Sequence, residues 1–332
     1  MIHAIGFNAV WIVYLGKKNG LFRSIALSSR PITPVALAEK MNLFAPAVRA
    51  WCHSAVCIGY LSEKKGKVFV PPGVKELVLN EESPYYIAGQ FMYSGLRSLE
   101  YGAFDDLFSY GKAKSPSSLN TMKAFEEVTS WDHYAFLNAI KTRNRKLHRI
   151  LMKGCAVLDV GCGAGKFMQR MITAYPRCEF TGIDPYADRI DTEKQKARDS
   201  QSNFDHKDLE ILKASGENMD FQEQFDLVYF GESLYLINNK QKAIRNSYNA
   251  LKGGGTIAIL EGLLPVGIKC GDSEESKMII TMQLDFVLQG HEFMSKKEVI
   301  SLLKQAGFMN VKLDHLGVSF YLVTATKPLF DP

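Results

Sequence analysis

The sequence has 332 residues, of which 46% are hydrophobic and 23% are charged. This composition is typical of a globular protein with enough length for two domains. The net charge of +5, from 40 basic and 35 acidic residues, is too small to indicate nucleic-acid binding. The six cysteines have neither zinc-ligand nor redox spacing, so we expect no metal site and a reducing, cytoplasmic location.

An apolar run near the start, residues 4–15, is the first predicted element. It has no preceding basic segment, and Asn8 and Trp11 interrupt it. A run of about a dozen residues is also too short to cross a bilayer. We therefore expect a core helix and no association with a membrane.

Two helices and a β-hairpin are predicted next. Residues 33–43 begin with a Thr-Pro pair, which favours a helix start, and a turn leads to a second helix at 47–61. Residues 62–72, SEKKGKVFVPP, indicate two short strands around a Lys-Gly turn. The order helix, turn, helix and β-wing predicts a winged helix.

DNA recognition by this winged helix is a rival interpretation. A recognition helix must present side chains that hydrogen-bond to base edges. Residues 47–61 offer chiefly Arg49, His53 and Ser54 among apolar groups, and the few lysines of the wing are typical of a solvated hairpin. We therefore expect the helix to pack against protein, and we do not expect nucleic acid as a partner.

After Gly154 the sequence changes from a mainly helical pattern to alternating strands and helices. This alternation predicts an α/β fold with a doubly wound, Rossmann-like parallel sheet. The predicted strands are 155–160, 178–183, 209–214, 225–230 and 255–261, followed by a closing antiparallel hairpin at 311–316 and 318–326. The predicted helices among them are 165–175, 187–199 and 238–252.

A glycine-rich loop follows the first of these strands, in VLDVGCGAGKF, residues 157–167. A P-loop needs four residues between its first glycine and Gly-Lys, but only three separate Gly161 from Gly165, and Phe167 stands where Ser or Thr is required. A dinucleotide fingerprint needs a glycine at the position of Lys166. Both phosphate-binding interpretations therefore fail.

The acidic residue before the loop indicates a different ligand. Asp159 would repel a pyrophosphate but could hold a cationic amino group, such as that of S-adenosylmethionine. The next strand ends in Asp184, whose carboxylate can accept from both ribose hydroxyls, and the third ends near Ser215 and Glu217, which would line the adenine. Each residue also has a plain structural explanation, as a tight turn, a helix cap or a surface acid, but their joint spacing favours cofactor binding.

Residues 150–328 resemble the class I S-adenosylmethionine-dependent methyltransferases. The resemblance rests on VLDVGCGAGKF, TGIDP, QFDLVYF, LKGGGTIAILE and AGFMNV, while Ser215 departs from it because many members have an acid there. It implies a seven-stranded domain with S-adenosylmethionine as cofactor and S-adenosylhomocysteine as product. The cofactor-binding residues that it implies are Asp159, Gly161, Cys162, Gly163, Gly165, Phe167, Asp184, Pro185, Ser215, Gly216, Glu217, Phe230 and Gly231.

The whole chain is similar, more loosely, to the plant-type small-molecule O-methyltransferases and their microbial relatives. This resemblance rests on the order of the domains and on motifs such as MQLDFVLQGHE before the last helix. It implies a winged-helix dimerisation domain at 1–84, a helical connector at 85–150 and an S-adenosylmethionine-binding methyltransferase domain at 151–328. A homodimer that methylates a hydroxyl of a small-molecule acceptor is the function implied. The alternatives are N-, S- or C-methyl transfer, a catalytically silent scaffold, and a DNA-binding regulator that senses S-adenosylmethionine.

The catalytic base departs from the plant-type pattern. That family keeps a histidine just after the fourth strand, but the matching stretch GESLYLIN has Tyr235 there or, with a slip of one, Leu236. A phenol with a pKa of about 10 is a poor base at neutral pH, so the family mechanism does not transfer directly. His291 and Glu232 join Tyr235 as candidate catalytic residues. For His133 we expect a structural hydrogen bond instead of a catalytic role.

Overall fold

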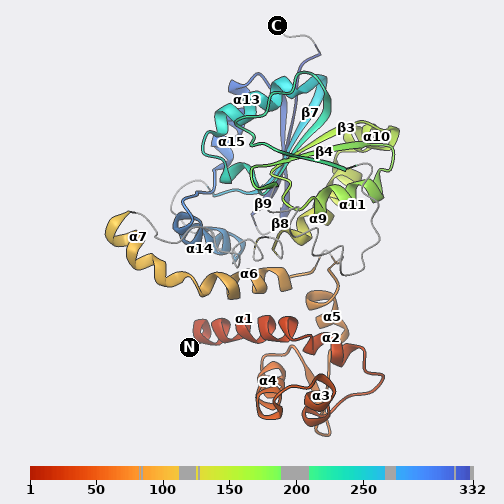
Figure 1. The fold of residues 1–332 in the computed structure, drawn as a ribbon, viewed down its shortest axis with the longest axis vertical. Coiled ribbons are helices and arrows are strands. Elements are labelled where there is room, and N and C mark those ends of the chain that lie inside the picture. The colour runs from red at the N-terminus through yellow and green to blue at the C-terminus, as the bar shows by residue number, and fades with distance from the viewer. Residues whose placement is uncertain are drawn as a thin grey trace. The chain divides into compact units, whose positions relative to one another are not determined.

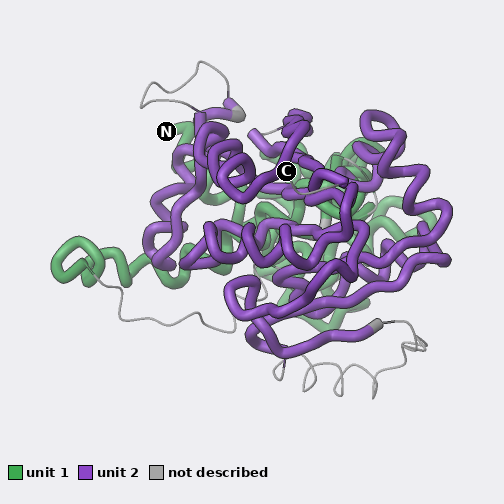
Figure 2. The backbone as a smooth tube through the Cα atoms, turned by 90° about the horizontal axis from the view of Figure 1, so that it is seen from above, with its two compact units in different colours: residues 1–134 green, residues 135–332 purple. Residues whose placement is uncertain are grey.

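The computed structural model describes residues 1–81, 83, 85–111, 125, 128–187, 209–265, 274–317 and 319–329. The chain divides into two compact units, Met1–Tyr134 and Ala135–Pro332 (Figure 2). The predicted helix at 187–199 lies outside the described residues except for Ala187. Within the described ranges, no helix combines the length and the apolar character that crossing a membrane requires.

The first unit consists of short helices and one small hairpin. Its elements are α1 (Ile2–Lys18), α2 (Leu21–Ala26), α3 (Pro34–Met41), α4 (Ala45–Cys57), β1 (Ser62–Lys64), β2 (Lys67–Phe69), α5 (Pro72–Val78), α6 (Ala88–Ser98), η1 (Tyr101–Ala103), α7 (Phe104–Tyr110) and η2 (Thr129–Trp131). The Thr33 side chain accepts a hydrogen bond from the Ala36 amide at the start of α3, and Pro34 occupies its first turn. The helix ends at Asn42 in the left-handed conformation.

Aromatic packing holds α1, α2 and α4 together. The rings of Phe22 and Trp51 meet edge to face with centroids 5.1 Å apart. The Trp51 indole donates to the Ile12 carbonyl oxygen at 2.8 Å. A Cβ at Gly16 would come within 2.4 Å of the Phe22 ring, so α1 can approach this cluster only because that position has no side chain.

The N-terminal half of α1, together with Leu15, is exposed within the described part of the chain. Ile2, Ile5, Phe7 and Leu15 are 76%, 50%, 55% and 41% exposed. The sequence predicted a core helix at 4–15, and this is wrong for half of the helix. The N-terminal unit buries only the C-terminal half of α1, at Val13, Tyr14 and Gly16, so the apolar side chains of its first two turns have no cover within this chain's described residues.

The second unit contains a seven-stranded, mostly parallel sheet, which confirms the predicted α/β architecture (Figure 1). The strand order is β5-β4-β3-β6-β7-β9-β8, parallel from β5 to β7 and antiparallel at the β7-β9 and β9-β8 pairs. The strands are β3 (Ala156–Val160), β4 (Glu179–Asp184), β5 (Leu209–Lys213), β6 (Phe225–Gly231), β7 (Leu251–Gly262), β8 (Met309–Gly317) and β9 (Phe320–Thr326). The helices and helical turns are α9 (Asp132–Arg143, which begins in the first unit), α10 (Arg145–Lys153), α11 (Lys166–Ala174), η3 (Leu234–Leu236), α13 (Lys240–Ala250), α14 (Glu274–Leu288) and α15 (Lys296–Gln305).

Helices cover both faces of this sheet. Side chains alternate between the two faces along each strand, and because apolar side chains point to both faces, both need cover. Leu158 and Ile257 point to the core that also contains residues of α13 and α15. Val157 and Ala258, one residue away in each strand, belong to the core formed with α9, α10 and α11. Figure 1 shows α13 and α15 on one side of the strands and α10 and α11 on the other.

The boundary between α13 and β7 differs from the prediction. The sequence predicted a helix to residue 252 and a strand from 255, whereas α13 ends at Ala250 and β7 begins at Leu251. Leu251 pairs with Phe225 of β6, and the register then shifts before Leu227 pairs with Thr256. The glycines between these two pairing sites therefore lie inside an irregular strand, which a count of helical periodicity does not anticipate.

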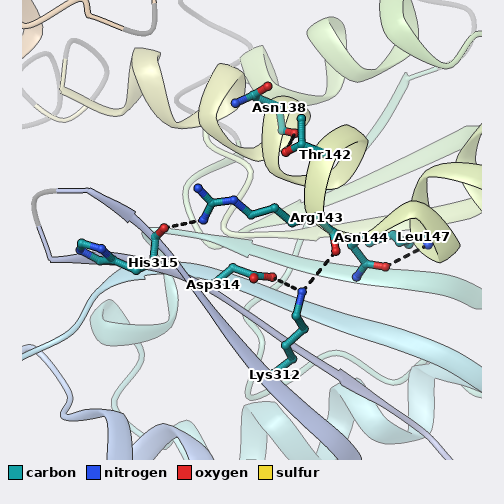
Figure 3. Close-up of polar contacts among 8 residues, drawn as sticks. All are labelled: Asn138, Thr142, Arg143, Asn144, Leu147, Lys312, Asp314 and His315. Atoms are coloured by element: carbon teal, nitrogen blue, oxygen red, sulfur yellow. Dashed lines mark hydrogen bonds and ion pairs between the residues drawn. The ribbon is translucent and has the colours of Figure 1, made fainter.

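Polar contacts join the α9–α10 junction to the edge strand β8 (Figure 3). The Arg143 guanidinium donates to the His315 carbonyl oxygen at 2.5 Å. The Lys312 ammonium donates to the Arg143 carbonyl oxygen at 3.2 Å and pairs with Asp314 at 2.9 Å. Asn144 caps α10 by accepting from the Leu147 amide at 3.1 Å. These contacts fix the helical segment that precedes β3 against the sheet.

Candidate active site

The predicted site lies at the carboxyl edge of the parallel strands in the second unit. The neighbours in the sheet are β5, β4, β3 and β6, so the loops that follow them meet at one edge. This edge brings together the glycine loop after β3, Asp184 at the end of β4, the turn at 215–217 after β5, and Glu232 directly after β6. Among the described residues, no three His, Cys, Asp or Glu side chains gather to hold a metal ion.

The glycine loop turns sharply and leaves open space. Gly161 has φ of 80°, and a Cβ there would lie 2.6 Å from the Ser233 Cβ. The Ser233 hydroxyl donates to the Val160 carbonyl oxygen at 2.6 Å, which closes the loop against the segment after β6. Gly163 has φ of 52° and no atom within 4 Å of an ideal Cβ. A ligand can therefore approach the backbone at Gly163 closely.

The Asp184 carboxylate joins the ends of β3 and β4. Its Oδ2 accepts from the Gly163 amide at 3.1 Å, and its Oδ1 accepts from the Tyr186 amide at 2.8 Å. A carboxylate has about four acceptor positions, so capacity remains for two ligand hydroxyls. Pro185 and Tyr186 beside it are exposed.

Asp159 is the most unusual group at this edge. It is 3% exposed, and its Oδ2 is buried without a hydrogen-bond partner among the described residues. Burial, followed by the nearby Asp184 charge, raises the pKa of the Asp159 carboxyl to about 8. A cationic ligand group would satisfy this oxygen and offset both charges, so the site fits the amino group of S-adenosylmethionine.

The turn after β5 is tied to α13. The Glu217 carboxylate accepts from the Asn239 amide at 2.6 Å, just before α13 begins. The Asn246 side chain of α13 donates to the Gly216 and Glu217 carbonyl oxygens, at 3.0 Å each. Ser215 is partly buried at the start of this turn. The backbone of the turn is therefore fixed. The Glu217 carboxylate is already used as a hydrogen-bond acceptor at the start of α13.

Two of the predicted cofactor-binding side chains lie in the core instead. Phe167 is 4% exposed and stacks on Tyr229 with ring centroids 4.0 Å apart. Phe230 is 0% exposed and belongs to the core on the other face of the sheet. Cys162 and Gly165 are also buried, and Gly231 is partly buried. The loop glycines and the acids can face a ligand, whereas these two phenyl rings support the strands and α11 from behind.

A second acidic group, Glu261, was not predicted from the sequence. It lies near the end of β7, is 1% exposed, and its Oε1 accepts from the Tyr235 amide at 3.0 Å. Burial raises the pKa of Glu261 to about 8; the Leu234 and Tyr235 amides and the Lys240 charge lower it in part, and the Glu232 charge raises it further. A glutamate at the carboxyl end of a central strand, inside an otherwise apolar run, was the signal available in the sequence.

Glu232 and Tyr235 lie on the segment between β6 and α13. Glu232 is 8% exposed and has φ of 49°, a conformation that non-glycine residues seldom adopt and that is concentrated at functional sites. Tyr235 is 1% exposed, and its ring packs against Phe286 at 4.8 Å and Phe293 at 5.6 Å between centroids. The Tyr235 ring is therefore part of an aromatic cluster with two residues from the region of α14.

His291 follows α14 and is partly buried. Its amide donates to the Phe286 carbonyl oxygen at 2.9 Å. Burial, followed by the charge of Lys240, lowers the pKa of His291, so its imidazole is neutral at neutral pH. Lys240 itself donates to the Ile237 carbonyl oxygen at 2.9 Å. His133, in contrast, lies on α9 within the first unit.

Comparisons with known proteins agree with this fold. Residues 151–307 match the family model described as a methyltransferase domain. An uncharacterized protein of Methanocaldococcus jannaschii is 30% identical over 173 residues, which are 52% of this chain and 73% of that protein. The O-methyltransferase rstn1 of Aspergillus nomiae is 26% identical over 196 residues, which are 57% of this chain and 82% of that protein.

Solved structures share the fold over almost the whole chain. Human N-acetylserotonin methyltransferase in complex with S-adenosylmethionine has a TM-score of 0.75 at 18% identity, covering 98% of this chain and 96% of that chain. CalO1, a methyltransferase in calicheamicin biosynthesis bound to S-adenosylhomocysteine, has a TM-score of 0.65 at 13% identity, covering 98% and 96%.

The sheet order and the acid-lined glycine loop define a Rossmann-like methyltransferase domain. The chain belongs to the methyltransferase family whose model it matches, as its sequence resemblance implied.

Proposed function

We propose that this enzyme transfers the methyl group of S-adenosylmethionine to a hydroxyl of a small-molecule acceptor. The observation that carries the proposal is a pair of groups with shifted pKa values, Glu261 near the carboxyl edge and His291 beyond it, both acted on by the charge of Lys240. A hydroxyl nucleophile must lose a proton, and groups with shifted pKa values are suited to accept one near neutral pH. The names of relatives such as rstn1, an O-methyltransferase, support the same choice.

The cofactor would be held by the groups around the glycine loop. Asp159 would pair with its amino group, Asp184 would accept from its ribose hydroxyls, and the backbone at Gly161 and Gly163 would approach it closely. The turn at 215–217 would face its adenine. When bound, the cofactor supplies a methyl group on a sulfonium, which an acceptor oxygen displaces in line.

His291 is the base that we favour in this chain. Its lowered pKa keeps the imidazole neutral and able to take a proton at neutral pH. Glu261 accepts from the Tyr235 amide, so it holds the backbone of the segment that carries Glu232 and Tyr235. Tyr235 is packed among aromatic rings, and we assign it to the acceptor side of the site, where aromatic residues suit an aromatic acceptor.

Methylation assays on matched acceptors test the proposal. Hydroxylated aromatic compounds are first screened for release of S-adenosylhomocysteine, and the best acceptor is then compared with its amine and thiol analogues on the same ring. We expect the hydroxyl compound to be methylated on oxygen, as read by mass spectrometry and NMR. Transfer to the amine or thiol analogue alone, or to ring carbon, would contradict the O-methyltransferase assignment.

We also propose that the N-terminal unit is a winged helix that forms a homodimer. Helices α3 and α4 are followed directly by the β1–β2 hairpin, which is the predicted order. The exposed apolar residues in the N-terminal half of α1 support self-association, since Ile5 and Phe7 are about half exposed within the described part of the chain.

Replacement of both Ile5 and Phe7 by glutamate is expected to convert the dimer to a monomer. Burying an apolar side chain of this size contributes roughly 1.5–3 kcal/mol, so loss of two per protomer should weaken the dimer at least about 100-fold. Sedimentation should give twice the chain mass for the unchanged protein and one chain mass for the variant. Met309→Glu, a comparably exposed apolar position on β8, is the control and should remain dimeric. A monomeric unchanged protein would contradict the proposal.

A DNA-binding role for the same unit has weaker support. A hollow of about 600 Å³ lies between α4 and the hairpin, lined by Arg49, His53 and Glu63 among others. The carboxylate of Glu63 beside these two groups would repel phosphate, which opposes duplex binding. Salt-sensitive binding to duplex DNA with a sequence preference would instead favour the regulator.

A further inference from the structure

Two cysteines that are distant in the sequence meet at the amino edge of the sheet. The Sγ atoms of Cys155 and Cys178 are 3.6 Å apart. Each residue directly precedes a strand, β3 and β4 respectively, and the Cys155 carbonyl oxygen accepts from the Glu179 amide at 3.0 Å. Since Ala156 pairs with Glu179 in register, the two cysteines occupy facing positions on neighbouring parallel strands. Their Cα atoms are thus at the strand-to-strand spacing that a disulfide tolerates.

The chemistry of the pair favours reaction. A hydrogen bond from the Cys155 thiol lowers the pKa of Cys178 to about 7, because it stabilises the thiolate. The same hydrogen bond, with burial, raises the pKa of Cys155. The Cys178 thiol also lies 3.2 Å from the Leu151 carbonyl oxygen, to which it can donate when protonated. The charged groups that face the pair are Asp226 and Lys252, which bind each other at 2.8 Å.

The pair is reachable and is separate from the cofactor site. Cys155 is partly exposed, whereas Cys178 is 6% exposed. The glycine loop lies at the other end of β3, a strand of five residues, so roughly 15 Å separates the thiols from that loop. A change at the thiols should therefore leave the cofactor-binding groups in place.

We propose that Cys155 and Cys178 form an intramolecular disulfide when the protein meets a peroxide. One thiolate attacks the peroxide oxygen and becomes a sulfenic acid, and the oxygen that leaves takes up a proton as water. The second thiol then displaces the sulfenic oxygen as a second water, and the S–S bond forms. Two thiols and one hydrogen peroxide thus give one disulfide and two waters, with sulfur oxidised and the peroxide reduced.

The disulfide would tie the first β-α-β unit of the domain into a closed loop. The closed segment runs from Cys155 to Cys178 and contains β3, the glycine loop and α11. A crosslink across a loop of this size lowers the conformational entropy of the unfolded chain and so stabilises the folded protein. The oxidised protein is expected to unfold roughly 5–10 °C higher than the reduced protein, with S-adenosylhomocysteine affinity unchanged.

The bond itself is tested by peptide mapping of the full chain. The protein is treated with hydrogen peroxide, remaining thiols are alkylated, and the digest is analysed without reduction. We expect a linked peptide containing Cys155 and Cys178, which disappears on treatment with dithiothreitol. Alkylated or singly oxidised Cys155 and Cys178, with no linked peptide, would overturn the proposal.

Variants separate this pair from the other thiols. Cys155→Ala and Cys178→Ala should each abolish the linked peptide and the rise in melting temperature on oxidation. Cys57→Ala, which removes an exposed thiol in the first unit, should preserve both. Because Cys155 is partly exposed, its variant should fold even if the Cys178 variant does not. A rise in melting temperature that persists in folded Cys155→Ala would assign the stabilisation to other cysteines and overturn the proposal.

Discussion

Replacement of Asp184 by alanine is expected to weaken S-adenosylhomocysteine binding by about 1.5–3 kcal/mol, or roughly 10- to 150-fold. The reason is the loss of charge-assisted acceptance from the ribose hydroxyls. The carboxylate is already oriented for this task, because the amides of Gly163 and Tyr186 donate to its two oxygens. Isothermal titration calorimetry on the purified protein measures the change directly.

Asp226 provides a matched control for this substitution. Its carboxylate also accepts from a backbone amide, that of Ala156 at 3.0 Å, but at the amino edge of the same sheet. Asp226→Ala should therefore leave the affinity for S-adenosylhomocysteine unchanged, even though it removes a comparable structural contact. Equal affinities of the Asp184 variant and the unchanged protein would remove Asp184 from the cofactor site. Equal losses in both variants would indicate damage to the fold instead.

The parts of the fold that could be predicted are those that local periodicity of apolar residues in the sequence indicates. Short apolar strands alternating with helices predicted the parallel sheet, and the observed β3 and β4 lie within one residue of the predicted ranges. The glycine loop and Asp184 were placed at the ends of successive strands. Because parallel strands bring these ends to one edge, strand order alone placed them together.

Side-chain direction could not be predicted in the same way. Phe167 and Phe230 are next to ligand-facing backbone in sequence, yet both rings are buried in the core. The sequence does not single out Glu261, because its neighbours in β7 are apolar and the run has the pattern of an ordinary central strand. Successive residues of a strand point to opposite faces of the sheet. The strand sequence alone does not predict on which face a buried polar side chain will find hydrogen-bond partners.

Contacts between segments that are distant in the sequence could not be predicted either. The spacing of Cys155 and Cys178 matches no redox motif, and only the register of β3 against β4 brings their thiols together. The apolar residues of the first 60 positions, Phe7 and Leu15 among them, are too numerous for one small domain to cover, but the sequence does not show which of them the chain leaves exposed. Both features depend on tertiary pairing, which local periodicity does not encode.

Replacement of His291 by alanine is expected to lower turnover by roughly 100-fold or more while S-adenosylhomocysteine affinity stays the same. His291 is placed to act as the base because the family's histidine is absent and Tyr235 is packed among Phe286 and Phe293. Since its pKa is lowered by burial and by Lys240, the imidazole remains neutral somewhat below pH 6.5. The rate of the unchanged protein should therefore fall only as the pH drops through this lowered pKa.

His148 supplies the control, because it is a partly buried histidine of the same unit with a structural hydrogen bond to the Tyr175 hydroxyl at 2.9 Å. His148→Ala should keep both the turnover and the acidic limb of the pH profile. Tyr235→Phe keeps the aromatic packing and should act mainly through the KM for the acceptor. Turnover of His291→Ala at the unchanged rate would exclude this histidine as the base. Proton removal would then rest with the buried carboxyls or with an acceptor acidic enough to ionise without help, and Glu261→Gln would separate those two cases.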